Sequence, residues 1–210
     1  METFHSGQLG DDRSMTEALQ IGSQEITNPS TAPLANFVPE FSIFDFPFLL
    51  SNEQVADTML DGEVGQNLLY KLENQNLVGL VYWENGYRDV TNSKIPLVFE
   101  GLKLRTMEYE LHLEAFKALG ANPTPMGLGE LFTAIQQGTV DGQENPVPTI
   151  YLQKFYEVQD YVSNIHIYSP FVFLMSKSFF DGLTEDQQVN VKEAALEAGK
   201  YERELNREAN

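Results

Sequence analysis

The stretch GLKLRTMEYELHLEAFKALGANPTPMGLGELFTAIQQGTVDGQENP, residues 101–146, predicts a strand–helix–strand–helix–strand run. Apolar residues in its two helical parts recur at spacings of three and four, which is the pattern of one buried helix face. Gly120 and Gly138 stand where a glycine typically ends a helix. Because strands alternate with helices over short connections, the sequence predicts an open α/β sheet.

Two polar side chains close predicted strands of this run. Arg105 lies at the end of strand 102–106, and Asn145 lies where Pro146 opens the next helix. Ligands of open α/β sheets bind in the crevice outside the carboxyl ends of the strands. Arginine also offers a planar pair of donors that matches a carboxylate. We therefore expect Arg105 and Asn145 to lie at a site for a carboxylate ligand.

Outside this run, the sequence gives weaker indications. A short strand is expected at residues 2–5, and the apolar run LVGLVYW, residues 77–83, has the length of a buried parallel strand. Residues 52–71 read as a helix with an interruption near its glycines, and residues 147–160 read as helical. Thr184, with Gln187 three positions later, forms a capping box that opens a long final helix.

Composition excludes several classes of function. The formal net charge is −18, with 31 acidic residues against 13 basic ones, so a nucleic-acid backbone would be repelled. A small anionic ligand remains possible, because a local arginine pair outweighs distant, screened charge. The chain has no cysteine, and its histidines and carboxylates show no metal-ligand spacing. We expect no metal and no cofactor, and no apolar stretch approaches the ~18 residues of a membrane span.

Four motifs within residues 101–146 resemble the solute-binding subunit of TRAP transporters, the DctP-like family: GLKLRT, LGANPTPM, ELFTAIQQG and VDGQENP. The resemblance continues over nearly the whole chain, from GQLGDDRSM to KFYEVQ and YSPFVFLMS. Members of that family bind organic acids between two α/β lobes, deliver them to a membrane permease and catalyse nothing.

The resemblance implies a two-lobed fold like that of periplasmic binding proteins, with the ligand cleft between the lobes and a long C-terminal helix. Residues 1–85 would form lobe I, residues 86–172 lobe II, and residues 173–210 would return to lobe I. Family members are exported, yet the first residues lack the basic and apolar parts of a signal peptide. We expect a fragment that is incomplete at both ends.

Roles for individual residues also follow from the resemblance. It implies that Arg105 forms the salt bridge to the ligand carboxylate, that Arg88 supports it, and that Asn145 hydrogen-bonds the same end of the ligand. Glu144 and His166 would orient these side chains from behind. The ligand-binding residues implied in total are Arg105, Arg88, Asn145, Ser30, Asp12, Tyr109 and Leu128.

Ordinary structural roles compete with these assignments. Asp12 could favour a helix dipole, Ser30 could cap a helix, and Arg88 could form a surface salt bridge. Two departures from the family also matter. The segment between Arg88 and Arg105 is a few residues shorter, and Leu128 stands where many relatives carry an aromatic ring that stacks on the ligand. A roomier or differently filled pocket is therefore expected.

The leading hypothesis is an extracytoplasmic, non-enzymatic binding protein for a small organic acid, such as a C4-dicarboxylate, a keto acid or a sugar acid. It would be a monomer that closes by hinge motion and docks on a TRAP permease, in the periplasm or anchored outside a single membrane. The alternative is an α/β enzyme that processes carboxylates, such as a lyase or hydrolase.

Overall fold

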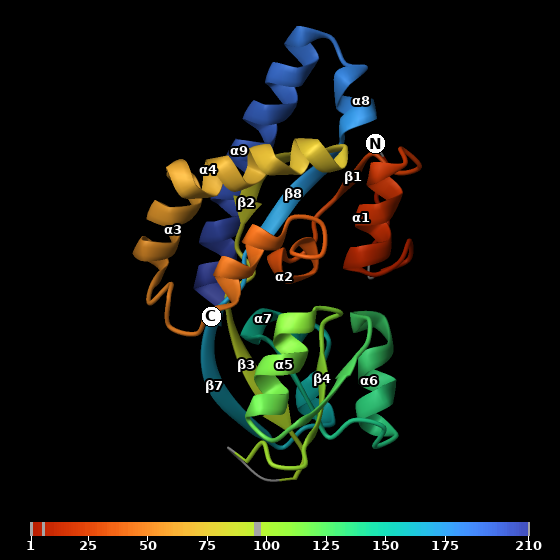
Figure 1. The fold of residues 1–210 in the computed structure, drawn as a ribbon, viewed down its shortest axis with the longest axis vertical. Helices are drawn as coiled ribbons and strands as arrows, with labels where there is room; N and C mark the ends of the chain where they lie inside the picture. Colours follow the sequence, from red (N-terminus) through yellow and green to blue (C-terminus); the bar gives the residue numbers. More distant parts are fainter. Residues whose placement is uncertain (1, 6, 95–97, 210) are drawn as a thin grey trace.

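The computed structural model describes residues 2–5, 7–94 and 98–209, except for the side chains of His166 and Ala209. The chain forms two lobes, each built on one sheet (Figure 1). The first sheet has the order β1 (Ile26–Thr27), β8 (Phe171–Ser176), β2 (Leu77–Trp83), and the second has the order β5 (Asn122–Pro125), β4 (Lys103–Thr106), β6 (Gly142–Pro146), β3 (Tyr87–Asn92), β7 (Tyr161–Tyr168).

Helices cover both sheets. Those of the first lobe are α1 (Asp12–Gln20), α2 (Thr31–Leu34), α3 (Glu53–Asp61), α4 (Glu63–Lys71), α8 (Lys177–Asp181) and α9 (Glu185–Ala209), with 3-10 turns η1 (Pro39–Asp45) and η2 (Leu72–Gln75). Those of the second lobe are α5 (Glu110–Ala118), α6 (Leu128–Gln136) and α7 (Val147–Leu152), with the 3-10 turn η3 (Phe155–Glu157). Within these described residues, no helix is long and apolar enough to cross a membrane.

The central strand–helix run is confirmed: it forms β4, α5, β5, α6 and β6 in order. β4 lies between β5 and β6 and pairs with both in parallel. Gly120 (φ 92°) and Gly138 (φ 71°) follow the two helices in the left-handed region, which a glycine occupies without steric cost. Parallel pairing brings the carboxyl ends of β4 and β6 to one edge of the sheet, so Arg105 and Asn145 share that edge.

Two pairs of strands cross between the lobes. β2 leads from the first lobe into β3 of the second, and β7 leads back into β8. β2 pairs with β8 and β3 pairs with β7, in both cases antiparallel, because one strand of each pair leaves a lobe and the other returns to it. The predicted parallel pairing of residues 77–83 is therefore wrong.

Other expectations had mixed outcomes. Residues 2–5 form no strand, and the helix expected over residues 147–160 stops at Leu152, because Lys154 adopts a left-handed conformation (φ 58°). The interruption of the helix over residues 52–71 is confirmed at Gly62, between α3 and α4. The capping box is confirmed too: the Thr184 amide donates to Gln187 Oε1 at 2.9 Å.

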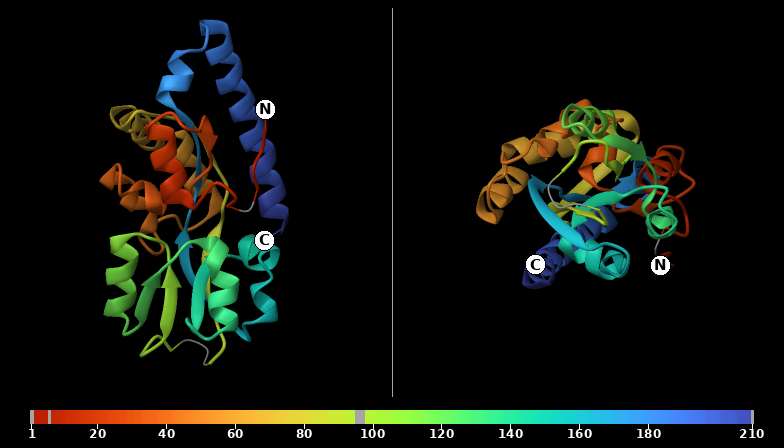
Figure 2. Two further views of the ribbon diagram at one scale, coloured as in Figure 1. Left: turned by 90° about the vertical axis from the view of Figure 1, so that its right-hand side faces the viewer. Right: turned by 90° about the horizontal axis from the view of Figure 1, so that it is seen from below.

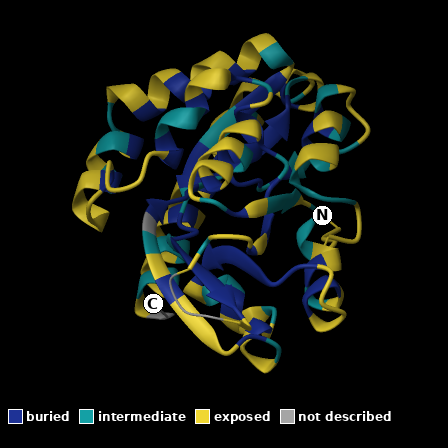
Figure 3. Cartoon of the chain, turned by 60° about the horizontal axis from the view of Figure 1, so that its bottom comes forward, coloured by how far each residue is buried: buried dark blue, intermediate teal, exposed yellow. Residues whose placement is uncertain are grey.

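Each lobe has its own apolar core. The first packs Leu19, Phe41, Leu72 and Leu174 between helices and sheet, and the second has smaller clusters around Leu104 and Leu131. Inner strands of both sheets are buried, whereas the outer faces of α3 and α4 are exposed (Figure 3). The lobe boundaries at residues 85/86 and 172/173 stay a prediction; the chain changes sheet between β2 and β3 and again between β7 and β8.

The long helix α9 runs beside the first lobe (Figure 2). It packs on β2, and its C-terminal end reaches the level at which the strands pass between the lobes. The final helix therefore contacts the connection between the lobes as well as the first core.

Candidate functional site

A cavity of about 570 Å³ lies between the two lobes. The first lobe contributes the start of α1, the start of α2 and the beginning of β8. The second contributes the carboxyl ends of β4 and β6, the start of α6 and one side of α7. The predicted site residues that line it are Arg105, Asn145, Asp12, Ser30 and Leu128.

Arg105 is the best candidate for holding an anion. Its residue is only 3% exposed, and its Nε donates a hydrogen bond to the carbonyl oxygen of Met126 at 2.9 Å. Its Nη1 is buried and has no hydrogen-bond partner in the described part of the chain. An unsatisfied buried donor on a charged group is costly, and a bound carboxylate would supply the missing acceptors. Arg105 lines the cavity in which such a ligand would lie.

The charge of Arg105 depends on its surroundings. Burial lowers the pKa of Arg105 to about 10, and the nearby positive charge of Arg88 acts in the same direction. The negative charges of Glu144 and Asp12 oppose this shift. The guanidinium therefore stays protonated at neutral pH and attracts an anion.

Arg88 has a different environment. It lies on β3, is 1% exposed and does not line the cavity. Its Nε pairs with the Glu144 carboxylate, and its Nη2 donates to the Glu144 carbonyl oxygen at 2.8 Å and to Asn145 Oδ1 at 3.2 Å. Its Nη1 donates to Ser169 Oγ at 3.3 Å. The surface salt bridge considered for Arg88 is wrong, and the structure places Arg88 behind the site.

Glu144 and Asn145 receive their orientation from this arrangement. Burial alone would raise the pKa of Glu144, but the charges of Arg88, His112 and Arg105, together with the hydrogen bond from Arg88, hold that pKa below the usual value. The Asn145 Nδ2 donates to Gln143 Oε1, while its Oδ1 accepts from Arg88. A side-chain amide has two donor hydrogens and two acceptor lone pairs, so Asn145 keeps one of each for a ligand. His166, the other residue expected behind the site, lies outside the described side chains.

Asp12 and Ser30 meet across the cavity wall. The Ser30 amide donates to Asp12 Oδ2 at 3.0 Å. Burial raises the pKa of Asp12, although the hydrogen bonds from Ser30 oppose the shift. Asp12 also lies in the first turn of α1, as the helix-dipole role considered for it requires, and Asp11 caps that helix: its Oδ1 accepts from the Ser14 amide at 2.8 Å. Ser30 makes no side-chain capping bond to α2, in contrast to the capping role considered for it.

Tyr109 does not line the cavity, in contrast to its expected role as a ligand contact. It is buried in the core of the first lobe, beside His112, with ring centroids 5.4 Å apart. Leu128, at the start of α6, does line the cavity, so an aliphatic side chain stands at that wall.

Several cavity residues were missed by the sequence reasoning. Asn85 follows β2 in a Glu-Asn-Gly turn, where turn chemistry alone explains an asparagine. Thr149 and Gln153 are four residues apart on α7 and its end, a spacing that could have indicated one polar face. Phe171 gave no signal beyond its place in an apolar strand.

The charge of the lining is mixed. Its acidic residues are Asp11, Asp12, Glu108 and Glu130, and its basic residues are Arg105 and Arg13. Arg13 is paired with Glu17 through a contact of 3.1 Å between Nε and Oε1. Over the described residues, no group of three His, Asp or Glu side chains could hold a metal ion.

The family model for bacterial extracellular solute-binding protein, family 7 (DctP), matches residues 1–210. A solute-binding protein of Verminephrobacter eiseniae is 43% identical over 208 residues, which cover 97% of this chain and 62% of that relative. The chain thus spans less than two thirds of the length of this relative. The 2,3-diketo-L-gulonate-binding periplasmic protein YiaO of Escherichia coli is 37% identical, with 98% and 64% covered.

The solved structures agree with these relatives. The sugar acid binding protein DctPAm of Advenella mimigardefordensis, in complex with galactonate, is 49% identical and superposes with a TM-score of 0.96. The match covers 99% of this chain and 69% of that one. A TRAP periplasmic solute-binding protein of Polaromonas, bound to D-erythronate, is 45% identical with a TM-score of 0.95 over 99% and 70% of the two chains.

These relatives are solute-binding proteins rather than enzymes, so the alternative of a carboxylate-processing enzyme finds no support. The two-lobed fold with its long C-terminal helix is confirmed by the solved structures. By the match over its whole length, the chain belongs to the DctP family of bacterial extracellular solute-binding proteins.

Proposed function

We propose that this chain forms the ligand site of a protein that captures a small organic acid through Arg105 and delivers it to a TRAP-type membrane permease. The observation that supports this most directly is that Arg105 lines the cavity while its buried Nη1 has no partner in the described residues. The Asn145 amide lines the same cavity and would hydrogen-bond the bound carboxylate.

The ligands of similar proteins support an acid. Relatives are named for binding galactonate, D-erythronate, 2,3-diketo-L-gulonate and C4-dicarboxylates, and each of these carries a carboxylate. In this chain we assign that carboxylate to Arg105, because Arg88 is already paired with Glu144 and lies behind the cavity wall.

The lining favours a ligand with one carboxylate and several hydroxyls over a dicarboxylate. Asp12, Glu108 and Glu130 line the cavity, and they would accept hydrogen bonds from hydroxyls but repel a second carboxylate. The other basic residue of the lining, Arg13, is already paired with Glu17. A polyhydroxy monocarboxylate therefore matches the charge of this cavity.

The cellular setting follows from the same proposal. The protein would act outside the cytoplasm, in the periplasm or anchored to the outer side of a single membrane, as a monomer. The TRAP permease would be its partner, and closure of the lobes over the acid would form the state that docks.

Calorimetric titration of the full-length protein tests the proposal. Galactonate, D-erythronate, succinate and the amide of galactonate would be compared at pH 7. We expect galactonate or D-erythronate to bind and the amide, which lacks the charge, to bind far more weakly. Equal affinity for acid and amide would contradict the ion pair with Arg105. Tighter binding of succinate would leave an organic-acid binder but reject the polyhydroxy ligand.

A further inference from the structure

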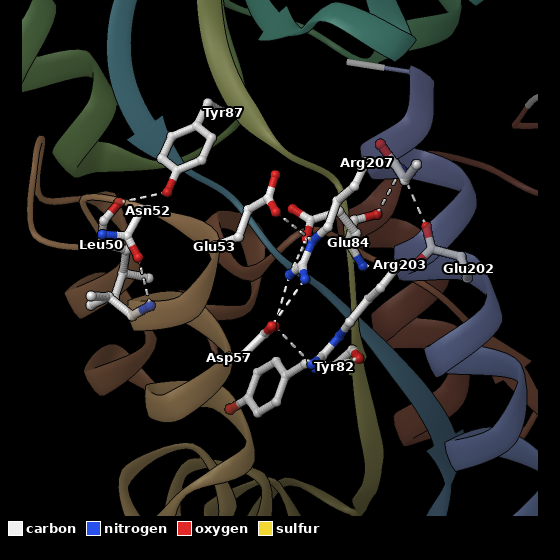
Figure 4. Close-up of polar contacts among 12 residues, drawn as sticks. Leu50, Asn52, Glu53, Asp57, Tyr82, Glu84, Tyr87, Glu202, Arg203 and Arg207 are labelled. Carbon is white, nitrogen blue, oxygen red and sulfur yellow. Dashed lines mark hydrogen bonds and ion pairs between the residues drawn. The ribbon is translucent and has the colours of Figure 1, made fainter.

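A cluster of charged side chains surrounds the point at which β2 leaves the first lobe (Figure 4). We call it the crossover cluster: Asp57 of α3, Glu84 after β2, and Glu202, Arg203 and Arg207 of α9. Glu84 is at its centre and is 1% exposed, although it carries a carboxylate. Buried carboxylates are rare unless they are paired, so this one needs an explanation.

α9 holds Glu84 by its backbone as well as by its side chain. The Glu84 amide donates to Glu202 Oε2 at 2.7 Å, and its carbonyl oxygen accepts from Asn206 Nδ2 at 3.0 Å. The Glu84 Oε2 accepts from Arg207 Nε at 2.9 Å. Both backbone groups of one residue are thus bound by side chains more than 100 positions away in the chain, which fixes the peptide planes on either side.

The same arginine connects the crossing to a third element. Arg207 also donates to Asp57 of α3 from Nη1 at 2.9 Å and from Nη2 at 2.7 Å. Figure 4 shows Arg207 between the two carboxylates. α3, α9 and the end of β2 are therefore joined through one guanidinium.

The next residue along the chain belongs to the ligand cavity. Asn85 is 4% exposed and lines the cavity, directly after the residue that α9 holds. Gly86 follows with φ 105°, a conformation that other residues rarely adopt, and its carbonyl oxygen accepts from the amide of Ser169, which lies between β7 and β8, at 3.0 Å. Asn85 is thus placed between an anchored residue and a turn that only glycine makes easily.

We infer that Glu84 is a positioning residue for the ligand site: α9 holds Glu84 so that the Asn85 side chain stays in the cavity. The inference rests on the proposed function, because Asn85 would contact the bound acid. Side chains at the end of α9 would thus influence ligand affinity without touching the ligand.

A double-mutant cycle tests this. Calorimetry with galactonate would compare Glu84→Gln, Asn85→Ala and the double variant in the full-length protein. Glu84→Gln keeps the shape but removes the charge that Arg207 holds, and we expect it to weaken binding about threefold to thirtyfold. If Glu84 acts through Asn85, the double variant binds no more weakly than Asn85→Ala alone. A role in stability alone would not produce this lack of additivity.

The matched control is Asp61→Asn. Asp61 pairs with Arg203 at 2.8 Å in the same region, but no hydrogen bond joins it to Glu84. Its affinity for galactonate should equal that of the wild type. Should Glu84→Gln fail to fold, Asn206→Ala removes the bond to the Glu84 carbonyl oxygen, together with the 3.2 Å bond to Glu202 Oε1, and carries the same expectation.

Two results would overturn the inference: unchanged affinity of Glu84→Gln, or losses that add up in the double variant. If the wild type binds none of the acids, the proposed function fails, and hydrogen exchange decides about Glu84 separately. Faster exchange of the Asn85 and Gly86 amides in Glu84→Gln would still support positioning, and equal exchange would reject it.

Discussion

The crossover cluster and the ligand cavity each contain an arginine, but the two arginines differ in how fully the protein pairs them. In the cluster, Arg207 donates to the carboxylates of Asp57 and Glu84 through all three of its nitrogens. In the cavity, Arg105 donates from Nε to the Met126 carbonyl oxygen, and its Nη1 has no partner in the described chain. Fully paired charge holds elements together, whereas the unpaired donor is available to a ligand.

Arg88 shows that burial does not separate the two cases. It is as buried as Arg105 and lies in the same sheet, on β3, but the Glu144 carboxylate pairs with it. Burying an ion is favourable only when good geometry and further hydrogen bonds compensate for lost hydration. Arg88 meets this condition within the protein, and Arg105 would meet it only with an anion bound.

The largest expected effect is on stability, in the second lobe. Arg88→Ala leaves the Glu144 carboxylate buried without its partner, so we expect the free energy of unfolding to fall by about 3–5 kcal/mol. Urea unfolding followed by circular dichroism measures this. A double variant, Arg88→Met with Glu144→Leu, removes both charges and should recover most of the loss. If Arg88→Ala were as stable as the wild type, the ion pair between Arg88 and Glu144 would not contribute to stability.

The second largest expected effect is on the affinity of the cavity for its ligand. Arg105→Ala removes one partner of a buried charge pair with the ligand, which costs about 2–5 kcal/mol, or roughly a thirtyfold to several-thousandfold loss. Arg105→Lys should recover only part, because an ammonium keeps the charge but loses the planar pair of donors. Titration calorimetry with galactonate measures both.

The melting temperature separates the roles of these two arginines. Among the described residues, Arg105 donates one hydrogen bond, to the Met126 carbonyl oxygen, so Arg105→Ala should melt close to the wild type. Unfolding of Arg105→Ala, or normal binding by it, would reverse the comparison with Arg88.

At the crossover cluster we expect a smaller loss of stability. Arg207→Ala removes charge-assisted hydrogen bonds to Asp57 and Glu84, and a fall of about 2 kcal/mol in the free energy of unfolding is expected. Arg203 limits the loss, because its Nη1 lies 3.1 Å from Asp57 Oδ1. Thermal and urea unfolding check this, with Arg207→Lys expected to be intermediate. A variant with unchanged stability would mean that the cluster is not stabilising.

Much of the fold could be predicted from the sequence, because local signals agreed with one another. In residues 101–146, helix periodicity and glycine stops lie within short segments, and the run folds as expected. The predicted parallel pairing of β2 was wrong because a run of apolar residues specifies burial, not strand direction. Direction depended on β8, which follows almost 90 residues later.

The sequence did not predict the role of a site residue where that role depends on side chains far away in the chain. Arg105 and Asn145 were identified because strand ends define a crevice. Nothing local distinguishes Arg88 from Arg105, since pairing with Glu144 depends on the register of β3 against β6. Asn85 was missed for a similar reason: the side chains that hold its neighbour lie in α9.

The pH dependence of binding should follow the ligand rather than Arg105. The pKa of Arg105, lowered to about 10, leaves it charged at every pH below 8, whereas a carboxylic acid protonates near pH 4. Because burial raises the pKa of Asp12, this side chain loses its negative charge at a higher pH than an ordinary aspartate and then repels the bound anion less. Affinity should thus be flat or slightly higher down to about pH 5.

Below the pKa of the ligand, affinity should fall about tenfold per pH unit, since only the anion pairs with Arg105. Calorimetry between pH 3 and pH 8 measures this, with Asp12→Asn as the control that removes any rise. A decline that begins near neutral pH would indicate that a protein group, and not the ligand, controls binding.

The smallest effect concerns the exposed side of the crossover cluster. Asp61 pairs with both terminal nitrogens of Arg203, at 2.8 and 2.9 Å, but its side chain is 56% exposed. Exposed ion pairs contribute about 0.2–1 kcal/mol and are screened by salt. Asp61→Asn should lower the free energy of unfolding by less than about 1 kcal/mol, and the difference should shrink further in 1 M NaCl. A loss as large as that of Arg207→Ala, unaffected by salt, would mean that burial does not set the strength of these pairs.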